Sequence, residues 1–551
     1  MNSTIDLQAI KSERCFRLNY FALLALIAVV TVSRNYAQVY NITDFGAVGN
    51  GSTVNTAAIQ AAIDTCSITG GTVLVPTGTF VTGTLVLKSN VTLEIHGTLQ
   101  GSPNISHYPD YISALRSMAD ASSQKSLLYA EQASHITLTG NGTINGNGLA
   151  FLGASNRPYG IRFISCRNVR YENIRLENAA FWMMHNQDID TLVIRNVTIF
   201  NNANSNNDGI GVDGCRNVLI ENCTVSSLDD PLVFKTTAPL NCENIVVQNC
   251  TLSTVARAIK IGTETAGGFR NILIKNCVVE PHILTADCGI NLAIVDGGFI
   301  DGLTLQNIVI SGVNTALSIR LGNQGRKYTP TAPVPPVGYI RNITLQDITI
   351  HAESNLSSTI SGIPGYYVDN ILLENFTVYF PGGMGTFPAS FVVPENETAR
   401  PNCDVLGDSI PAHGVFMRHV RNMRLQNVCF HASAADQRPA VVADDVVDSS
   451  PFVIIPSGNS VCVDALPSAV VAERENNPAI TILEGGQTVL IASKGQAVIT
   501  DAELFDATGK RIWSKTVHAR EFRFDFSAQK GVYFCKIKFS SETSFTFKLV
   551  R

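Results

Sequence analysis

Short runs of alternating apolar and polar residues recur along most of the chain, and they predict stacked β-strands. The clearest copies are NVLIENC, NIVVQNC and NILIKNC, which begin at Asn217, Asn244 and Asn271. Each run is rich in β-branched residues and is too short to bury its own apolar face. Copies that follow one another at a step of 27 residues (217 to 244, then 244 to 271) would bury one continuous core if they stacked. The pattern therefore predicts a right-handed parallel β-helix.

Looser copies of the run extend the predicted β-helix over most of the chain. They begin at Asn168, Thr191, Gly302, Asn342, Asn370 and Asn422, with fainter copies at Asn90 and His135. Five residues after these starts, and with Asp347 as the exception, one column of the register holds asparagine: Asn173, Asn196, Asn222, Asn249, Asn276, Asn307, Asn375 and Asn427. Asparagine tolerates the left-handed backbone conformation, and its amide can bond to the coils above and below. This column therefore predicts corners between strands.

The next column of the register is apolar, and Cys223, Cys250 and Cys277 lie in it. The chain has 13 cysteines, and so many in an exported protein would ordinarily suggest disulfides. Thiols that fill an apolar column are instead commonly inert packing residues, although neighbouring members of the column could lie near enough to bridge. We therefore expect these three side chains to be buried in the core.

The repeat is bounded at both ends, and the predicted fold class is all-β. Asn55 to Cys66 has the pattern of an amphipathic helix, which would cover the open end of the first coil. Two stretches break the period and are expected to be loops, at 329–338 and 382–414. The expected divisions of the chain are a signal peptide at 1–37, the β-helix at 38–462, a linker at 463–478 and a small antiparallel β-sandwich at 479–551.

Residues 1–37 have the pattern of an export signal. Basic residues precede an apolar run from Tyr20 to Val32, and the small Ala37 then suits cleavage. The run is short for a membrane span and no stop-transfer pattern follows it, so a membrane anchor is the weaker alternative. The sequence predicts a secreted protein that starts at Gln38 and has no membrane span after cleavage.

The charge of the chain argues against a nucleic-acid partner. Forty Lys and Arg residues stand against 45 Asp and Glu residues, which gives a net charge of −5. The basic residues are scattered rather than clustered. The chemistry of the protein must therefore lie in local clusters of residues.

Two Asp-Asp pairs stand out, and one of them has a third acid nearby in the register. Asp229 and Asp230 precede an apolar run, and Asp208, 21 residues before Asp229, stands at the equivalent point of the preceding segment. Residues about one coil apart stack, so these three carboxylates should cluster on one face of the helix. Asp444 and Asp445 lie in the last coil without such an acidic partner, and they are interpreted as structural.

Three clustered carboxylates suit glycoside hydrolysis. One of them must be protonated to donate to the leaving oxygen, and another must be ionised to activate water. Crowding of like charges keeps one carboxyl group protonated near neutral pH. Calcium binding is a competing use of such a cluster, and a purely structural cluster is a third interpretation.

With these acids in place, the chain resembles glycoside hydrolase family 28, the polygalacturonase-like β-helix enzymes. The likeness runs from about Tyr40 to Asp448, and it is carried by the opening DFGAVGNGSTVNTAAIQAAIDTCSITGGTVLVPTGTF and by FWMMHN, NNDG and LDD. The resemblance implies that Asp229 is the general acid, that Asp208 and Asp230 hold the attacking water, and that the configuration is inverted.

The resemblance also implies two substrate contacts. Asn206 begins the Asn-x-Asp motif that ends at Asp208, and Lys235 stands where the family often has a polar residue that lines the groove. An inverting enzyme would place its acid and base carboxyl groups roughly 6.5–9.5 Å apart, which leaves space for a water molecule.

Two segments depart from the pattern of the family. Arg257 occupies the position of the family's histidine, and Asn291-Leu292-Ala293 aligns with the Arg-Ile-Lys segment that grips a substrate carboxylate. A neutral Asn and an Ala cannot clamp a carboxylate as Arg and Lys do. The departure predicts poor activity on unbranched homogalacturonan and better activity on rhamnogalacturonan-like or other pectic oligosaccharides.

Other cations could take over the lost contact. Arg257 and Lys260 are expected beside the groove and Arg320 on a later coil, although each could equally be a solvated or core-edge cation. Glu264 could be a further carboxylate near the site, although a turn residue is the preferred interpretation. His185 is interpreted as a packed structural histidine rather than a base.

The last residues of the chain resemble the C-terminal sorting domain of proteins exported by the type IX system of Bacteroidetes. The likeness rests on Leu504-Phe505-Asp506 with Gly509-Lys510, on Gly531-Val532-Tyr533 and on the terminal Lys548-Leu549-Val550-Arg551. It implies a contact with export machinery. An ordinary accessory β-sandwich is the alternative.

The sequence thus predicts a secreted, monomeric, inverting hydrolase of an α-linked, pectin-derived glycan that uses no metal or other cofactor. Two alternatives stay open. One is a polysaccharide lyase on the same fold, which would need a metal and an Arg or Lys base. The other is a non-catalytic glycan-binding protein.

Overall fold

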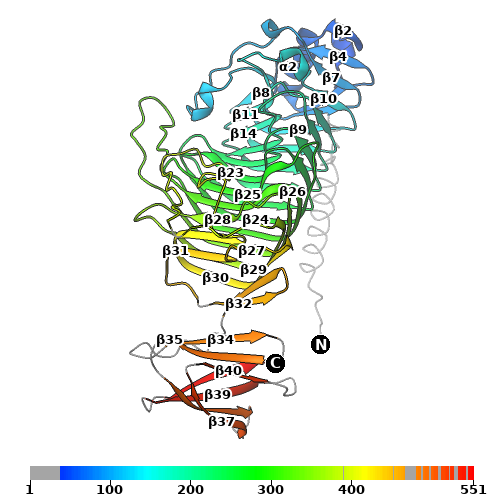
Figure 1. The fold of residues 1–551 in the computed structure, drawn as a ribbon. Coiled ribbons are helices and arrows are strands. Elements are labelled where there is room, and N and C mark those ends of the chain that lie inside the picture. The colour runs from blue at the N-terminus through cyan, green and yellow to red at the C-terminus, as the bar shows by residue number, and fades with distance from the viewer. Residues whose placement is uncertain are drawn as a thin grey trace, which may run out of the picture.

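The computed structural model describes residues 38–388, 390–450, 452–465, 479–485, 488–494, 498–506, 511–519, 521–525, 532–540 and 544–550. The expected signal peptide lies outside the described residues, as does the part of the expected linker from residue 466 onward. The described chain winds into a parallel β-helix, followed by a smaller unit of antiparallel strands (Figure 1). The predicted all-β fold is confirmed. Among the described residues, no helix is long and apolar enough to cross a membrane.

Successive coils of the β-helix pair in parallel along three faces. The first face consists of β1 (Val39–Asn41), β3 (Gly71–Val75), β6 (Val91–Ile95), β9 (Ser134–Thr139), β12 (Arg167–Glu172), β15 (Asp190–Arg195), β18 (Arg216–Glu221), β21 (Cys242–Gln248) and the start of β24 (Gly268–Glu280). The second face consists of β2 (Asn50–Val54), β4 (Thr79–Thr82), β7 (Thr98–Gly101), β10 (Thr143–Asn145), β13 (Arg175–Glu177), β16 (Thr198–Asn201), β19 (Thr224–Ser227), β22 (Thr251–Thr254) and the end of β24.

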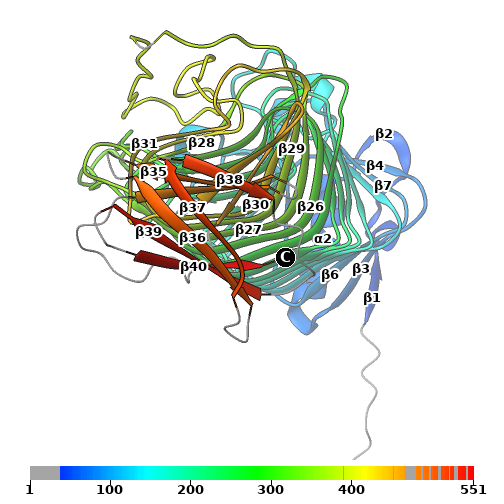
Figure 2. The ribbon, with the colours of Figure 1, turned by 60° about the horizontal axis from the view of Figure 1, so that its bottom comes forward.

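The third face carries the candidate site. It consists of β5 (Leu85–Val86), β8 (Ser126–Glu131), β11 (Tyr159–Ile164), β14 (Met184–Gln187), β17 (Ile210–Asp213), β20 (Leu232–Thr236), β23 (Arg257–Thr265), β25 (Ala286–Ile294), β28 (Ser358–Ser361) and β31 (Val441–Val447). In the later coils, long strands continue around the corners from face to face: β26 (Phe299–Leu321), β27 (Tyr339–Ala352), β29 (Val368–Gly382) and β30 (Val415–Ala434). Figure 2 shows these coils superimposed, with the loops gathered at one side.

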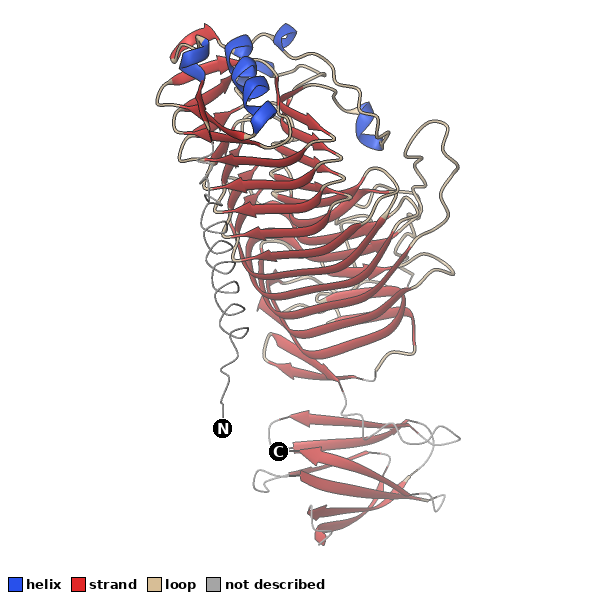
Figure 3. Ribbon diagram, turned by 180° about the vertical axis from the view of Figure 1, so that it is seen from behind, coloured by secondary structure: helices blue, strands red, loops and turns tan. Residues whose placement is uncertain are grey.

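Both ends of the helix are closed. Helix α2 (Thr56–Thr69) buries Ile59, Ile63 and Cys66 against the first coil, as the amphipathic pattern predicts (Figure 3). The N-terminal third of the chain also contains four short 3-10 helices: η1 (Ile42–Phe45), η2 (Ile105–His107), η3 (Met118–Ala121) and η4 (Gly148–Phe151). At the other end, the antiparallel strands β32 (Phe452–Ser457) and β33 (Ser460–Ala465) cover the last coil. Strand β33 therefore continues three residues into the segment expected to be a linker.

The asparagine column forms the corners that the sequence predicts. Every member has a positive φ, between 50° and 56°, and Asp347 adopts the same conformation. The amides bond from coil to coil, for example from Asn196 Nδ2 to Asn173 Oδ1 at 2.9 Å. The residues that start each copy also have positive φ, and Gly302 takes this place with φ of 88°. Each coil thus turns twice at residues that tolerate the left-handed region.

The apolar column is buried as expected. Cys223, Cys250 and Cys277 are at most 3% exposed, and their thiols are free. Outside this column, Cys429 and Cys462 form a disulfide. Cys429 lies one residue past the apolar column, where the register points away from the core, and β33 brings Cys462 opposite it.

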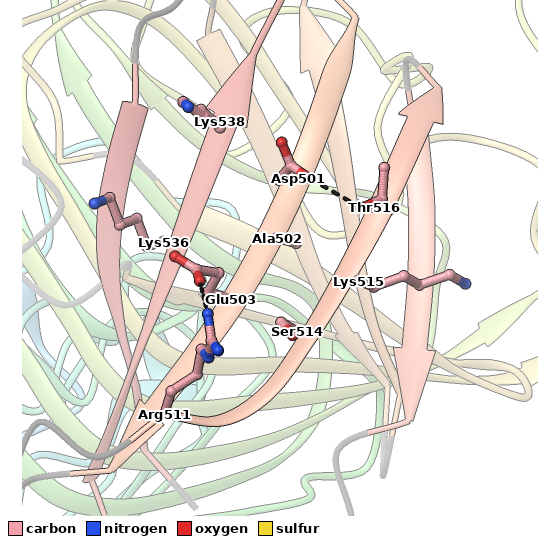
Figure 4. A pocket seen from close by; sticks show the side chains of 9 residues that line it. All are labelled: Asp501, Ala502, Glu503, Arg511, Ser514, Lys515, Thr516, Lys536 and Lys538. Atoms are coloured by element: carbon pink, nitrogen blue, oxygen red, sulfur yellow. Dashed lines mark hydrogen bonds and ion pairs between the residues drawn. The ribbon is translucent and has the colours of Figure 1, made fainter.

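The C-terminal unit consists of two antiparallel sheets. One contains β34 (Ala479–Gly485), β35 (Thr488–Lys494) and β38 (Glu521–Asp525), and the other contains β37 (Arg511–Ala519), β36 (Ile499–Asp506), β39 (Val532–Phe539) and β40 (Ser544–Val550). On the four-stranded sheet, Arg511 Nη1 donates to Glu503 Oε1 at 2.7 Å beside Lys536 and Lys538 (Figure 4). Four basic side chains (Arg511, Lys515, Lys536 and Lys538) and two acidic ones (Asp501 and Glu503) line this face.

Candidate active site

Three aspartates meet on the third face, at the turns that precede β17 and β20. The two strands pair in parallel with Ile210 opposite Leu232. Asp208 and Asp230 each stand two residues before these partners, so the register stacks them, and Asp229 is adjacent. One oxygen from each of the three carboxylates lies within 4.8 Å of the others. The structure thus brings together the acids that the repeat predicts to cluster.

Two lysines give the three acids different charge environments. Lys260 Nζ lies 2.5 Å from Asp230 Oδ2, and both side chains are almost fully buried. Lys235 Nζ lies 3.9 Å from Asp208 Oδ2 but 3.0 Å from Glu264 Oε2. Asp229 is partly exposed and has no lysine within ion-pair distance among the described residues. Only Asp230 therefore has a cation in direct contact.

These environments separate the pKa values of the three carboxyl groups. Burial and the charge of Asp230 raise the pKa of Asp229 to about 6. Burial and the charge of Asp229 raise the pKa of Asp208 well above its usual range. Burial alone would also raise the pKa of Asp230, but the charges of Lys260 and Lys235 lower it below its ordinary value. A proton donor and an ionised carboxylate therefore lie side by side in weakly acidic solution.

One oxygen of the ionised carboxylate is free. Asp230 Oδ2 receives Lys260, while Asp230 Oδ1 is buried and has no hydrogen-bond partner among the described residues. A buried carboxylate oxygen without a donor is costly unless a ligand or a water molecule supplies one. Asp230 Oδ1 is therefore an acceptor that still lacks a donor among the described residues.

An inverting glycosidase is expected to hold its acid and base carboxyl groups roughly 6.5–9.5 Å apart. The 4.8 Å limit joins the nearest oxygens, whereas the expected range separates whole carboxyl groups across a bound substrate. The nearest-oxygen distance does not measure that separation, so the predicted spacing stays a prediction.

The same three oxygens are close enough to share a divalent cation. The ammonium group of Lys260 already contacts Asp230, and that of Lys235 lies beside Asp208. The two buried ammonium groups already balance the negative charge of the carboxylates, as a metal ion would. They would also repel a metal ion. The donor set therefore favours acid–base chemistry over calcium binding.

Three of the predicted substrate contacts lie at or beside the acids. Lys235 and Lys260 form the ion pairs described above, so both are occupied by carboxylates of the protein. The Arg257 guanidinium is paired with Asp287 Oδ2 at 3.2 Å and donates to Asn402 Oδ1 at 3.3 Å. Arg257 lines a small hollow on the side of the site toward the later coils.

Two other predicted contacts are corrected by the structure. Asn291 is 1% exposed, and its amide donates to Pro401 O and to Cys403 Sγ. Arg320 is also 1% exposed, and its guanidinium donates to Ser361 Oγ and to the carbonyl oxygens of Gly362, Glu395 and Asn396. Both side chains lie beneath the loop that the sequence predicts at 382–414, so neither can reach a glycan.

Asn206 lies at the exposed edge of the site rather than among the acids. It has φ of 54°, and its Oδ1 accepts from Arg157 Nη2 at 3.0 Å. The conformation turns the chain into the segment that carries Asp208, so the contribution of Asn206 visible here is to the shape of the turn.

The interpretation of His185 fits the structure, whereas the preferred interpretation of Glu264, as a turn residue, is wrong. His185 is buried, its Nε2 lies 2.9 Å from Asp213 Oδ2, and burial lowers its pKa. Glu264 lies within β23 rather than in a turn, and burial of this carboxyl is outweighed by Lys235 and Arg326, which lower its pKa. Glu264 thus belongs to the charge network of the site.

Two residues of the site were not singled out from the sequence. The ammonium group of Lys235 lies over the ring of Trp182, and its Nζ is 4.6 Å from the ring centroid. Arg326 bonds Glu264 Oε1 at 3.4 Å and Asp296 Oδ2 at 2.7 Å. Trp182 belongs to the FWMMHN motif, so the sequence contained a signal for it. Arg326 lies outside the repeat, so the spacing of the repeat could not predict its position.

Comparison with known proteins agrees with this site. The sequence model of glycosyl hydrolases family 28 matches residues 66–385, which is more than half of the 551-residue chain. The chain belongs to glycosyl hydrolases family 28. The match includes the turns that carry the three aspartates and the strands that carry both lysines.

Curated relatives resemble part of this family 28 chain. A probable polygalacturonase of Vitis vinifera is 32% identical over 267 residues, which are 42% of this chain and 54% of the relative. An exo-poly-alpha-D-galacturonosidase of Dickeya chrysanthemi is 42% identical over 130 residues, 22% of this chain and 21% of the relative. The chain thus spans about half, or less, of the length of these relatives.

Solved structures support the fold of this family 28 member. A family 28 exopolygalacturonase of Yersinia enterocolitica superimposes with a TM-score of 0.61 at 19% identity, covering 75% of this chain and 78% of that one. An exopolygalacturonase of Thermotoga maritima superimposes with a TM-score of 0.56 at 21% identity, covering 71% of this chain and 91% of that one. At these identities the likeness establishes the right-handed β-helix alone.

Proposed function

We propose that this protein hydrolyses an α-linked pectic glycan, with Asp229 as the acid and Asp230 as the base. The observation that carries the proposal is the contrast between two adjacent carboxyl groups. The pKa of Asp229 is raised to about 6, whereas Asp230 is held ionised by Lys260 with one oxygen free. Membership of family 28 and the names of the relatives support a pectic substrate.

The proposed reaction balances with these residues alone. Asp229 donates its proton to the glycosidic oxygen as the bond to the anomeric carbon breaks. A water molecule attacks that carbon from the opposite side, and Asp230 Oδ1 takes its proton. Asp208, whose pKa is raised by burial and by the charge of Asp229, holds the water by a hydrogen bond. The products are two shorter glycans, and the two aspartates exchange protons with solvent before the next cycle.

Reducing-end release from pectic fractions, read beside absorbance in the near ultraviolet, tests the reaction class. We expect new reducing ends without any rise in absorbance. A polysaccharide lyase would leave an unsaturated sugar that absorbs there, and a glycan-binding protein would release nothing. Either of these outcomes would overturn the proposal.

We also propose that the enzyme acts on the ends of glycan chains. Outward side chains of the third face are buried on both sides of the acids, so the open part of this face is short. Toward the N-terminal coils, Arg162 is fully buried because it donates to Tyr111 O at 3.0 Å and to Gln124 Oε1 at 3.2 Å. Met118 N also donates to Thr237 O at 2.8 Å, so the segment around η3 lies over the sheet beside the site.

A second wall covers the later coils. This wall is the loop at 382–414, which contacts Asn291 and Arg320. Arg418 Nη1 also donates a hydrogen bond to the loop, at Val393 O, over 2.8 Å. Figure 1 shows both walls projecting from the same side of the helix. A long polymer laid along the helix axis would collide with them, whereas a chain end could enter between them. The relatives that are named as exo-acting enzymes support this proposal.

The products of an early digest test the chain-end proposal. We expect short oligosaccharides or monosaccharides to appear first, with the viscosity of the polymer falling slowly as reducing ends accumulate. An endo-acting pectinase serves as the reference, since it lowers viscosity after few cleavages. If this protein matches the reference, then the walls do not block the polymer and the chain-end proposal fails.

The choice between pectic polymers depends on the missing cations. The relatives named as polygalacturonases favour homogalacturonan. Arg257 is already paired with Asp287, Lys235 with Glu264 and Lys260 with Asp230. Because these three cations are engaged within the protein, a neutral sugar is favoured beside the cleaved bond. Rhamnogalacturonan-like oligosaccharides are therefore the second candidate substrate.

A comparison of kcat/KM on the two polymers separates these candidates. Because Arg257, Lys235 and Lys260 are already paired, we expect rhamnogalacturonan-like oligosaccharides to be cleaved better by roughly tenfold or more, which corresponds to about 1.4 kcal/mol. If homogalacturonan is preferred instead, Arg257 is the cation left to bind its carboxylate. In that case Arg257→Ala should raise KM on homogalacturonan.

We further propose, from the pattern of residues 1–37, that the protein acts outside the cell. The C-terminal unit would then contact the export machinery, in line with its resemblance to a sorting domain.

A further inference from the structure

The register of the strands brings the side chain of Lys260 into contact with Asp230 rather than toward the glycan. On the third face, Val233 of β20, Lys260 of β23 and Asn291 of β25 are successive partners. Both neighbours of Lys260 in this column are therefore uncharged. Its ammonium group lies 2.5 Å from Asp230 Oδ2, and the two side chains are 7% and 2% exposed. The lysine is thus too enclosed, and too closely paired, to serve as a free substrate contact.

The other lysine of the site is arranged differently. Lys235 is bonded to Glu264 at 3.0 Å and lies 3.9 Å from Asp208. Much of its charge is consequently balanced by a carboxylate outside the three aspartates. Among the described residues, Lys260 forms an ion pair with Asp230 alone, so its charge acts mainly on the proposed base.

Resting on the proposed function, we propose that Lys260 is a positioning residue that keeps Asp230 ionised, turns its free oxygen toward the water, and so sets the pH range of the reaction. Lys260 occupies Oδ2 of Asp230, which leaves Oδ1 as the oxygen available to the water. A neutral residue at position 260 would leave both oxygens unpaired and the carboxylate free to rotate.

The direction of the pH effect follows from the charges around the pair. Asp229 and Asp208 face Asp230 from the adjoining turns, and Lys235 and Arg257 face it from β20 and β23. Loss of the Lys260 charge removes a lowering influence on the pKa of Asp230 and on that of Asp229. Activity requires Asp230 ionised, which sets the acid limb, and Asp229 protonated, which sets the basic limb. Both limbs should therefore move to higher pH.

The experiment is the pH profile of kcat/KM for Lys260→Met on the pectic fraction that the unchanged protein cleaves. We expect the acid limb to move up by roughly 1–3 pH units, the usual effect of an opposite charge within a few ångströms, and the basic limb to move in the same direction. Lys260→Arg keeps the charge and should restore both limbs. Lys88→Met, which removes a surface lysine paired with Asp64, is the matched control and should leave the profile unchanged.

A merely structural role gives a different result. Activity that falls equally at every pH, with both limbs in place, would overturn the inference while leaving the proposed function intact. Unchanged protein that releases no sugar at any pH would overturn both. If circular dichroism shows that Lys260→Met does not fold, Lys260→Gln is measured instead, because its amide can still reach Asp230 without carrying a charge.

Discussion

The Asp229→Asn variant is expected to lose roughly 10²–10⁴-fold of the hydrolytic rate, while its fold and glycan binding persist. Asn has the same shape as Asp but no proton to donate to the leaving oxygen. The pKa of Asp229, about 6, shows that this group still carries its proton in weakly acidic solution. Asp229 is also the partly exposed member of the three acids, so it is the one that a glycan can reach. The measurement is kcat on a pectic fraction beside glycan binding by calorimetry.

Asp444→Asn is the matched control for this loss. Asp444 belongs to the second Asp-Asp pair, and its carboxylate accepts from Arg418 Nε at 2.8 Å, far along the helix from the site. Its neighbour Asp445 is likewise bonded, to His419 Nδ1 at 2.6 Å. The control should keep most of the rate. Equal losses in the two variants would show that the wrong pair has been assigned to catalysis.

The Cys250→Asp variant is expected to be less stable than the unchanged protein by roughly 3–5 kcal/mol. Cys250 is 3% exposed between Cys223 and Cys277 in the apolar column, so the new carboxylate would have no partner and no water. Burial of such a charge is among the largest single-residue effects known. Urea unfolding, followed by circular dichroism, gives the difference in the free energy of unfolding.

Val278→Asp is the control for the register. Val278 follows Cys277 directly and is 41% exposed, because the next residue of a strand points to the opposite side. The new carboxylate is solvated there, so the stability should change little. A loss as large as that of Cys250→Asp would mean that the register is displaced by one residue.

The repeat made the fold predictable, because one register fixes backbone conformation, burial and stacking together. Asn222 and Asn249 marked corners, and Cys250 marked the core, from sequence spacing alone. The same register stacked Asp208 on Asp230. These features follow from local periodicity, which a single sequence displays.

Features outside the repeat were not predictable in this way. The burial of Asn291 and Arg320 depends on a loop that has no period, so nothing in the sequence said that it folds back over the third face. The pairing of Lys260 with Asp230 depends on which way a long side chain turns. The disulfide from Cys429 depends on β33, an antiparallel strand that does not belong to the helical register.

The most direct test of the central claim is a proton NMR time course of a pectic oligosaccharide digest. If Asp229 and Asp230 act as acid and base on an α-linkage, the first new reducing sugar is the β-anomer, and the α-anomer grows in later by mutarotation. The α-anomer appearing first would show retention, and vinyl proton signals would show elimination. Either result would contradict the proposed direct attack of water.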